Sequence, residues 1–180
     1  MVRRLTRKSR AIAAFPRRGH DHGRCVSDAL TAAAALCARE GERLTPLRKR
    51  VLEFVWSSHQ PIGAYAILDR LRTENGRAVG PPTVYRALEF LVERGLVHRL
   101  ASLNAFVGCA QPGGAHIVQF LICRQCGTAA ELDDARVAGA LDRRAAALGF
   151  RVQDQVIELS GLCSQCQNEP PNAGAHADGE

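Results

Sequence analysis

Long apolar runs are missing from this 180-residue chain. The longest run, residues 32–38, is mostly alanine, whereas a membrane-spanning helix requires about 18 apolar residues. The arginine-rich start also lacks the apolar stretch of about 7 to 15 residues that is typical of a secretory signal. We therefore expect a cytoplasmic protein that does not span a membrane and whose cysteines stay reduced.

Cysteine is scarce. The seven cysteines are an odd number and too few for a disulfide scaffold. In a reducing compartment they indicate metal binding or thiol chemistry instead. With 46% hydrophobic and 23% charged residues, the composition is that of a globular protein and excludes a disordered chain. The length allows one domain or two small ones.

Lysine is nearly absent, and arginine carries the positive charge unevenly. Residues 1–24 hold eight Lys or Arg against one Asp, residues 28–100 hold eleven against eight acidic residues, and residues 101–180 hold five against nine. A basic first half and an acidic second half favour a polyanion, such as nucleic acid, as the partner of the first half. The alternative is a coding bias towards arginine without functional meaning.

Four helical patterns follow one another between residues 28 and 95. They are predicted at residues 28–40, from Thr45-Pro46 to about Ser58, at residues 65–75, and from Pro81-Pro82 to Gly95. In the fourth, Arg86 lies about 200° from Val84 and Leu88 and projects outward if these two are buried. The third and fourth patterns therefore resemble a helix-turn-helix.

An outward arginine near a helix start suits a bidentate contact with guanine in the major groove. Thr83 and Tyr85 flank Arg86 and are available for phosphate or thymine-methyl contacts. The competing interpretation is that Arg86 is an ordinary solvated arginine.

Behind the fourth helix the pattern becomes extended. Residues 96–102 and 105–109 flank a predicted turn at Leu103-Asn104, which gives a hairpin and completes a winged helix. A two-residue turn places His98 directly opposite Cys109. Opposed side chains have Cβ atoms about 4.5–5.5 Å apart, close enough to share one metal ion.

The remaining chain predicts a small α/β unit, so that the fold class is α+β. Strands are expected at residues 117–122, 129–132 and 150–159, with a helix capped by Asp134 whose inward face carries Val137, Ala140, Leu141 and Leu148. We divide the chain into a mobile basic extension (1–27), a winged-helix domain (28–109), a second domain (110–167) and a mobile tail (168–180).

Two C-x-x-C knuckles lie in the second domain. They supply four thiolates for one closed, tetrahedral zinc site, which would tie the last strand to the early strands: Cys123, Cys126, Cys163 and Cys166. A redox dithiol needs only one such pair, so the doublet disfavours thioredoxin-like chemistry.

A looser set of donors bridges the two domains and comprises His98, Cys109, His116 and Glu131. Two imidazoles, one thiolate and one carboxylate would bind a dication, and the thiolate favours zinc over ferrous iron or manganese. Taken singly, each also has a plain explanation as a wing residue, a buried thiol or a surface polar group.

Several segments resemble the ferric uptake regulator family, in particular its zinc uptake regulator branch. The resemblance rests on residues 82–88 (PTVYRAL), 95–98 (GLVH) and 104–109 (NAFVGC) and on the two knuckles, and covers about residues 28–167. It implies a sensing zinc ion at the looser set and a structural one at the knuckles, two ions per subunit. Iron-sensing members carry a histidine-rich stretch before the first knuckle, where this chain has the apolar residues 117–121.

The resemblance also implies a homodimer that binds a palindromic, A·T-rich operator. In it the second domain pairs the subunits. Tyr65 and Arg86 match positions that contact DNA, while Asp69 and Arg72 match positions that pair between two dimers on one operator. We predict a zinc-responsive repressor that silences zinc-uptake genes, and not an enzyme.

Three alternatives are weighed against this prediction. A sibling regulator would respond to iron, manganese or nickel, and a thiol-based redox sensor would use Cys109 or the knuckles. A zinc hydrolase or deaminase needs an open metal position, and the deaminase signature is absent. Five residues stay unassigned: His20, His22, Cys25, Cys37 and His59. Cys37 is expected as a buried helix thiol, and His20 and His22 could bind metal adventitiously.

Overall fold

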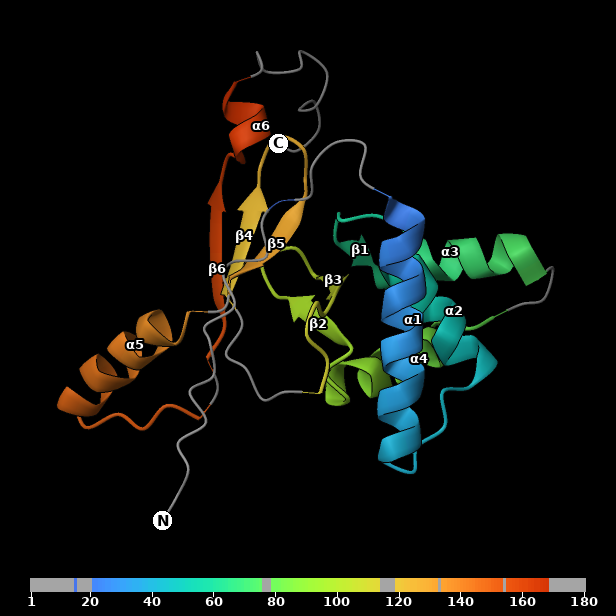
Figure 1. Cartoon of the computed structure of the whole chain (residues 1–180), viewed down its shortest axis with the longest axis horizontal. Coiled ribbons are helices and arrows are strands. Elements are labelled where there is room, and N and C mark those ends of the chain that lie inside the picture. Colours follow the sequence, from blue (N-terminus) through green and yellow to red (C-terminus); the bar gives the residue numbers. More distant parts are fainter. Residues whose placement is uncertain are drawn as a thin grey trace.

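The chain folds into two lobes that lie side by side (Figure 1). The computed structural model describes residues 15, 21–75, 79–113, 119–132, 134–153 and 155–168. Helices dominate the first lobe, and a three-stranded sheet forms the centre of the second. Among these described residues no helix is both long and apolar enough to cross a membrane.

The first lobe is a winged helix, as predicted. Its elements are α1 (His22–Arg39), α2 (Pro46–Val55), β1 (Ile62–Gly63), α3 (Ala64–Asn75), α4 (Pro81–Glu93), β2 (Val97–Leu100) and β3 (Ala105–Gly108). The strands form an antiparallel sheet in the order β1-β3-β2. The apolar stripes of all four helices meet in one core, to which Cys37 contributes as a buried thiol.

Helix α1 begins earlier than predicted. The sequence placed its start at Asp28, but the helix starts at His22 behind the N-cap Asp21, whose carboxylate accepts a hydrogen bond from the Arg24 N–H (3.2 Å). Residues 22–27 therefore belong to the helix and not to a mobile extension. Apolar periodicity could not reveal this turn, because residues 22–27 include Gly23 and only one aliphatic residue, Val26.

The predicted turn of the wing is wrong by two residues. Residues 101–104 all lie between β2 and β3, and Asn104 adopts a positive φ of 45°. As a result His98 pairs with Val107 and not with Cys109. A shift of two residues keeps side chains on the same face of a sheet, so Cys109 remains a diagonal neighbour of His98.

The second lobe contains β4 (Gln119–Cys123), β5 (Ala129–Leu132), α5 (Ala135–Ala147), β6 (Ile157–Gly161) and α6 (Ser164–Gln167). The sheet order is β5-β4-β6, with β4 antiparallel to β5 and parallel to β6. Residues 117–118 of the first predicted strand lie outside the described residues. The last strand starts at Ile157, seven residues later than predicted.

Helix α5 does not turn its apolar side inward, as the sequence prediction had it. It extends away from the sheet (Figure 1), and only Ala138 is buried among its residues. Ala140 is also exposed. The larger apolar side chains in and beyond the helix are exposed as well: Val137, Leu141, Leu148 and Phe150. The amphipathic pattern is real, but within the described part of one chain nothing covers its apolar face.

The hairpin of the first lobe packs on the sheet of the second. Leu100 and Val107 contact Phe120, Ile122 and Ala129 in a small apolar cluster that contains side chains of both lobes. At the hairpin tip, the Glu158 carboxylate of β6 accepts hydrogen bonds from the backbone N–H groups of Ala101 (2.7 Å) and Ser102 (3.1 Å). Burial opposes ionisation of Glu158, but bonds from Ser102 and Ala101 keep its pKa below the usual value.

Close packing between α2 and the wing leads to a first prediction. A Cβ atom built on Gly108 would lie 2.2 Å from Cε2 of the Trp56 ring. Gly108→Ala should therefore lower the free energy of unfolding of the winged helix by ~1–3 kcal/mol, which urea titration followed by Trp56 fluorescence can measure. Gly63→Ala is the matched control, because its Cβ would meet no atom within 4 Å. Equal stability of the two variants would contradict the contact.

Candidate metal centres and DNA-facing surface

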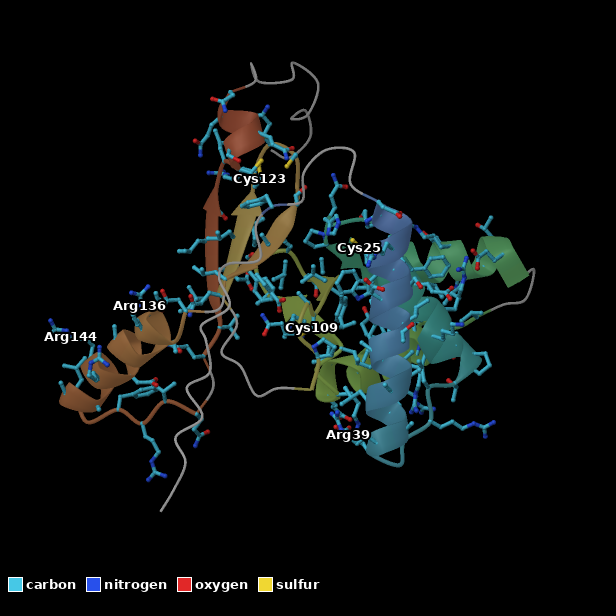
Figure 2. All side chains as sticks on the ribbon, in the orientation of Figure 1. Cys25, Arg39, Cys109, Cys123, Arg136 and Arg144 are labelled. Carbon is cyan, nitrogen blue, oxygen red and sulfur yellow. The ribbon has the colours of Figure 1, made fainter. Side chains whose placement is uncertain are left out.

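The four knuckle cysteines come together, as their spacing predicts. Cys123 ends β4, Cys126 lies in the following turn, and Cys163 and Cys166 stand at the start and in the middle of α6. All four sulfur atoms lie within 4.8 Å of one another, and the Sγ atoms of Cys126 and Cys163 are 3.9 Å apart. We call this group the four-cysteine cluster; Figure 2 labels Cys123 beside α6.

Backbone donors prepare one of these sulfurs for a cation. Burial raises the pKa of the Cys123 thiol, but hydrogen bonds from the backbone of Cys126, Cys163 and Gln125 bring it down to about 6. Burial and the neighbouring thiols instead raise the pKa of Cys166 to about 12. Four sulfurs this close cannot all be ionised without a counter-charge. The donor set therefore fits a tetrahedral dication bound by thiolates.

A second group of donors stands where the two lobes meet. His98 of β2, Cys109 just after β3 and Glu131 of β5 have ligand atoms within 4.8 Å of one another. His98 Nε2 lies 2.9 Å from Glu131 Oε1, and the other carboxylate oxygen accepts a hydrogen bond from Ala110 N–H (2.8 Å). We call this group the junction cluster. His116, the fourth predicted member, lies outside the described residues.

The Cys109 thiol is held in its protonated form. Burial raises its pKa to about 12, and the negative charge of Glu131 acts in the same direction. A bound cation would reverse this balance, because a coordinating thiol loses its proton. One imidazole, one thiol and one carboxylate, all largely shielded from water, form a donor set that fits zinc.

The predicted orientation of α4 is confirmed. Val84 and Leu88 are buried, and Thr83 and Arg86 are exposed beside them. Tyr65, at the start of α3, is 67% exposed, and Tyr85 is 40% exposed. Both tyrosines line one hollow between α3, α4 and the wing.

Two residues missed by the sequence prediction extend this surface. Thr45 and Arg48 line a shallow hollow together with Thr83 and Arg86. The Arg48 guanidinium lies 3.4 Å from the centre of the Phe90 ring. Arg48 belongs to α2, so only the packing of α2 against α4 could place Arg48 beside Arg86.

Asp69 and Arg72 occupy the exposed side of α3. In the single chain they pair with each other, with 3.9 Å between Arg72 Nη1 and Asp69 Oδ1. Arg72 Nε also donates to the Val79 carbonyl (3.2 Å). Both side chains are accessible to a second molecule, since Arg72 is 49% and Asp69 75% exposed.

Comparisons with known proteins show which family the chain is similar to. A model of the ferric uptake regulator family matches residues 39–160. The zinc uptake regulation protein of Escherichia coli (strain K12) is 40% identical over 144 residues, covering 78% of this chain and 82% of that protein. The chain belongs to the ferric uptake regulator family. Members of this family are transcription regulators, so the chain is a regulator and not an enzyme.

Other family members extend the comparison. The zinc uptake regulation protein of Mycobacterium tuberculosis (strain CDC 1551 / Oshkosh) is 32% identical over 108 residues, 58% of this chain and 79% of that protein. Holo XcZur has a TM-score of 0.72 at 45% identity, covering 80% of this chain and 99% of that one. A zinc uptake regulator complexed with zinc and DNA has a TM-score of 0.73 at 38% identity, covering 79% and 95%.

The four-cysteine cluster generates a prediction about folding. Cys126→Ser removes one thiolate, so the chain should lose one zinc ion and the second lobe should unfold at a lower temperature. Each ~1 kcal/mol lost lowers the melting temperature of a domain of this size by roughly 4–8 °C. Zinc content and thermal unfolding under reducing conditions measure both effects. Cys37→Ala, at a buried thiol far from the cluster, should retain the full zinc content, and equal loss in both variants would contradict the assignment.

Proposed function

We propose that the protein is a zinc-responsive transcriptional repressor that binds a palindromic operator as a zinc-loaded homodimer and silences zinc-uptake genes in the cytoplasm. The observation that carries this proposal is the junction cluster, because its donors come from both lobes. The names of the E. coli and M. tuberculosis relatives point to the same metal.

The donor sets support two zinc ions per subunit. The four-cysteine cluster would hold a structural ion, and His98, Cys109 and Glu131, with His116 as fourth ligand, would hold a regulatory one. Both sets contain thiolate, which favours zinc over manganese or ferrous iron. When bound, zinc would supply bonds that join donors from different segments of the chain.

The chain's own residues link this site to DNA. His98 and Cys109 belong to the wing, which follows α4 directly and packs on it. A wing fixed to β5 through Glu131 fixes α4 relative to the second lobe, and hence relative to α4 of a partner subunit. Arg86 is proposed to contact base edges, with Thr83 and Tyr85 near it on α4. Tyr65, which lines a hollow together with Tyr85, is proposed to contact DNA as well.

The coupling between zinc and DNA is thermodynamic. An ion that binds one arrangement of the lobes more tightly shifts the population to that arrangement. If this arrangement also matches the spacing of two operator half-sites, DNA must tighten zinc binding by the same factor. Regulation then needs no covalent change in the protein.

The second lobe supplies the proposed dimer surface. Its exposed large apolar side chains gather on α5, β6 and the segments beside them: Val137, Leu141, Leu148, Phe150, Val156, Leu159 and Leu162. So many exposed apolar groups are typical of a protein interface. A second copy of this chain is the occupant that a palindromic operator requires. Asp69 and Arg72 are proposed to pair between neighbouring dimers where two dimers share one operator.

Replacement of Cys109 tests the proposal most directly. Cys109→Ser should raise the zinc concentration for half-maximal operator binding by roughly 5- to 150-fold, the usual range of allosteric coupling. Fluorescence anisotropy of a labelled operator, titrated in parallel with zinc, iron, manganese and nickel, measures it. An unchanged zinc response would refute the regulatory site, and a response to iron, manganese or nickel alone would favour the sibling regulator. A response to oxidant without any metal would favour the redox sensor.

The dimer surface is tested separately. Leu141→Asp should increase the dissociation constant of the dimer at least about tenfold, since it places a charge in an apolar interface. Sedimentation velocity in saturating zinc measures the dissociation. Leu103→Asp is the control, because Leu103 is 48% exposed and Leu141 47%, but Leu103 lies in the wing. A dimer that survives Leu141→Asp unchanged would exclude this face.

A further inference from the structure

We propose that His22, Cys25 and His59 form a third zinc site, separate from the two above. A ligand atom from each of these side chains lies within 4.8 Å of the other two, as close as in the four-cysteine and junction clusters. We call them the N-terminal cluster. Neither the sequence resemblance nor the family comparison assigns a metal to these residues.

Local structure brings the three donors together. His22 and Cys25 stand three residues apart in the first turn of α1, and so share one face of the helix. His59 comes from the loop between α2 and β1. Its ring centre lies 4.7 Å from that of His22, with an interplanar angle of 65°. All three residues are half-buried, which partly shields the donors from water.

The donor chemistry selects the metal. Two imidazoles and one thiolate are a set that zinc binds readily, whereas magnesium, calcium and manganese prefer oxygen ligands. Three protein ligands leave a fourth tetrahedral position open to water, unlike the closed four-cysteine site. We therefore expect weaker, reversible binding at the N-terminal cluster.

The loop that carries His59 also holds the second lobe. The His59 carbonyl accepts a hydrogen bond from Ala129 N–H of β5 (3.1 Å). The adjacent Gln60 side chain donates to the carbonyl of Cys126 (2.7 Å). An ion at the N-terminal cluster would therefore fasten α1 to a loop that already contacts β5 and the knuckle turn.

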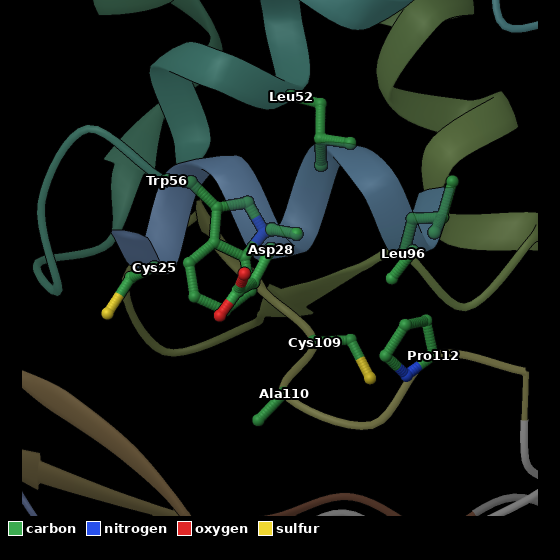
Figure 3. A pocket seen from close by; sticks show the side chains of 10 residues that line it. Cys25, Asp28, Leu52, Trp56, Leu96, Cys109, Ala110 and Pro112 are labelled. Carbon is green, nitrogen blue, oxygen red and sulfur yellow. The ribbon is translucent and has the colours of Figure 1, made fainter. Parts of the chain in front are cut away.

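Trp56 connects this cluster with the junction cluster. Cys25, Trp56 and Cys109 line one cavity, and Figure 3 shows the two cysteines on opposite sides of the indole. The same ring lies against Gly108, the residue before Cys109. The cavity that Cys25 lines is thus bordered by a ring that lies against the wing strand. If the proposed function holds, zinc at the N-terminal cluster favours the DNA-binding arrangement and lowers the zinc concentration needed for operator binding.

A cobalt titration detects the third site without relying on activity. Full-length Cys109→Ser, with zinc retained in the four-cysteine cluster, lacks the regulatory thiolate. Added cobalt(II) should still give a thiolate-to-cobalt charge-transfer band, because Cys25 remains. The band should vanish in Cys109→Ser/Cys25→Ser. In Cys109→Ser/His59→Ala, the apparent affinity for cobalt should fall at least about tenfold. Cys109→Ser/Cys37→Ala, which changes a thiol elsewhere on α1, should keep it.

The outcomes separate this site from the proposed function. Absence of the band in Cys109→Ser, or its persistence after Cys25→Ser, would overturn the third site. A site that binds copper(I) but not zinc in competition would overturn the choice of metal. Should the double variant fold poorly, zinc content of the single variant His22→Ala decides: one ion fewer than wild type supports the site, and equal content refutes it.

Operator binding then tests separately whether the N-terminal cluster is linked to DNA binding. In His59→Ala, with Cys109 intact, the zinc concentration for half-maximal operator binding should rise about three- to tenfold. No change in that concentration, with the cobalt band present, would leave the site standing and refute its regulatory effect. Failure of the proposed function instead appears as an unchanged zinc response in Cys109→Ser.

Discussion

The carboxylate of Glu131 is the contact on which the arrangement of the two lobes depends. One oxygen lies 2.9 Å from His98 of the wing and the other accepts the Ala110 N–H, so a single side chain of β5 holds the wing strand and the segment that follows it. Around it, the shared apolar cluster at Leu100 and Phe120 excludes water. The position of α4 follows, because the wing is continuous with that helix.

This junction is polar at its centre, and that composition has a cost. Burial of the Cys109 thiol, and after it the charge of Glu131, raises the pKa of Cys109, so without a cation the junction keeps a neutral thiol beside the carboxylate. An apolar junction would be more stable without metal, but it would give the ion no donors. Under the proposed function, this set of polar donors would let the arrangement of the lobes respond to a bound cation.

The sequence predicted features correctly where the residues that form them are close together in the chain. The knuckles, the outward face of Arg86 and the cap at Asp134 each depend on residues within one turn or one helix. The sequence prediction failed where the structure depends on a single backbone conformation or on which other residues cover a side chain. The wing register depended on the left-handed Asn104, and Leu141 of α5 faces solvent because the described part of one chain does not cover it. The clustering of His22 with His59 required tertiary packing, although the His-x-x-Cys spacing at residues 22–25 was a signal for half of it.

The loop between α2 and β1 gives these separate features a common physical basis. His59 hydrogen-bonds to Ala129, two residues before Glu131 on the same strand, while Gln60 binds the knuckle at Cys126. Each of the three donor clusters therefore contains a residue that lies close to this loop in structure. The residue either belongs to the loop, or is within one or two residues of a contact made by the loop or by Trp56, the first residue of the loop. An ion bound at any one cluster would restrict the same few backbone segments. The loss of conformational entropy on binding would therefore be smaller for the next ion. Cooperative zinc uptake would then follow from shared geometry and would require no additional conformational state.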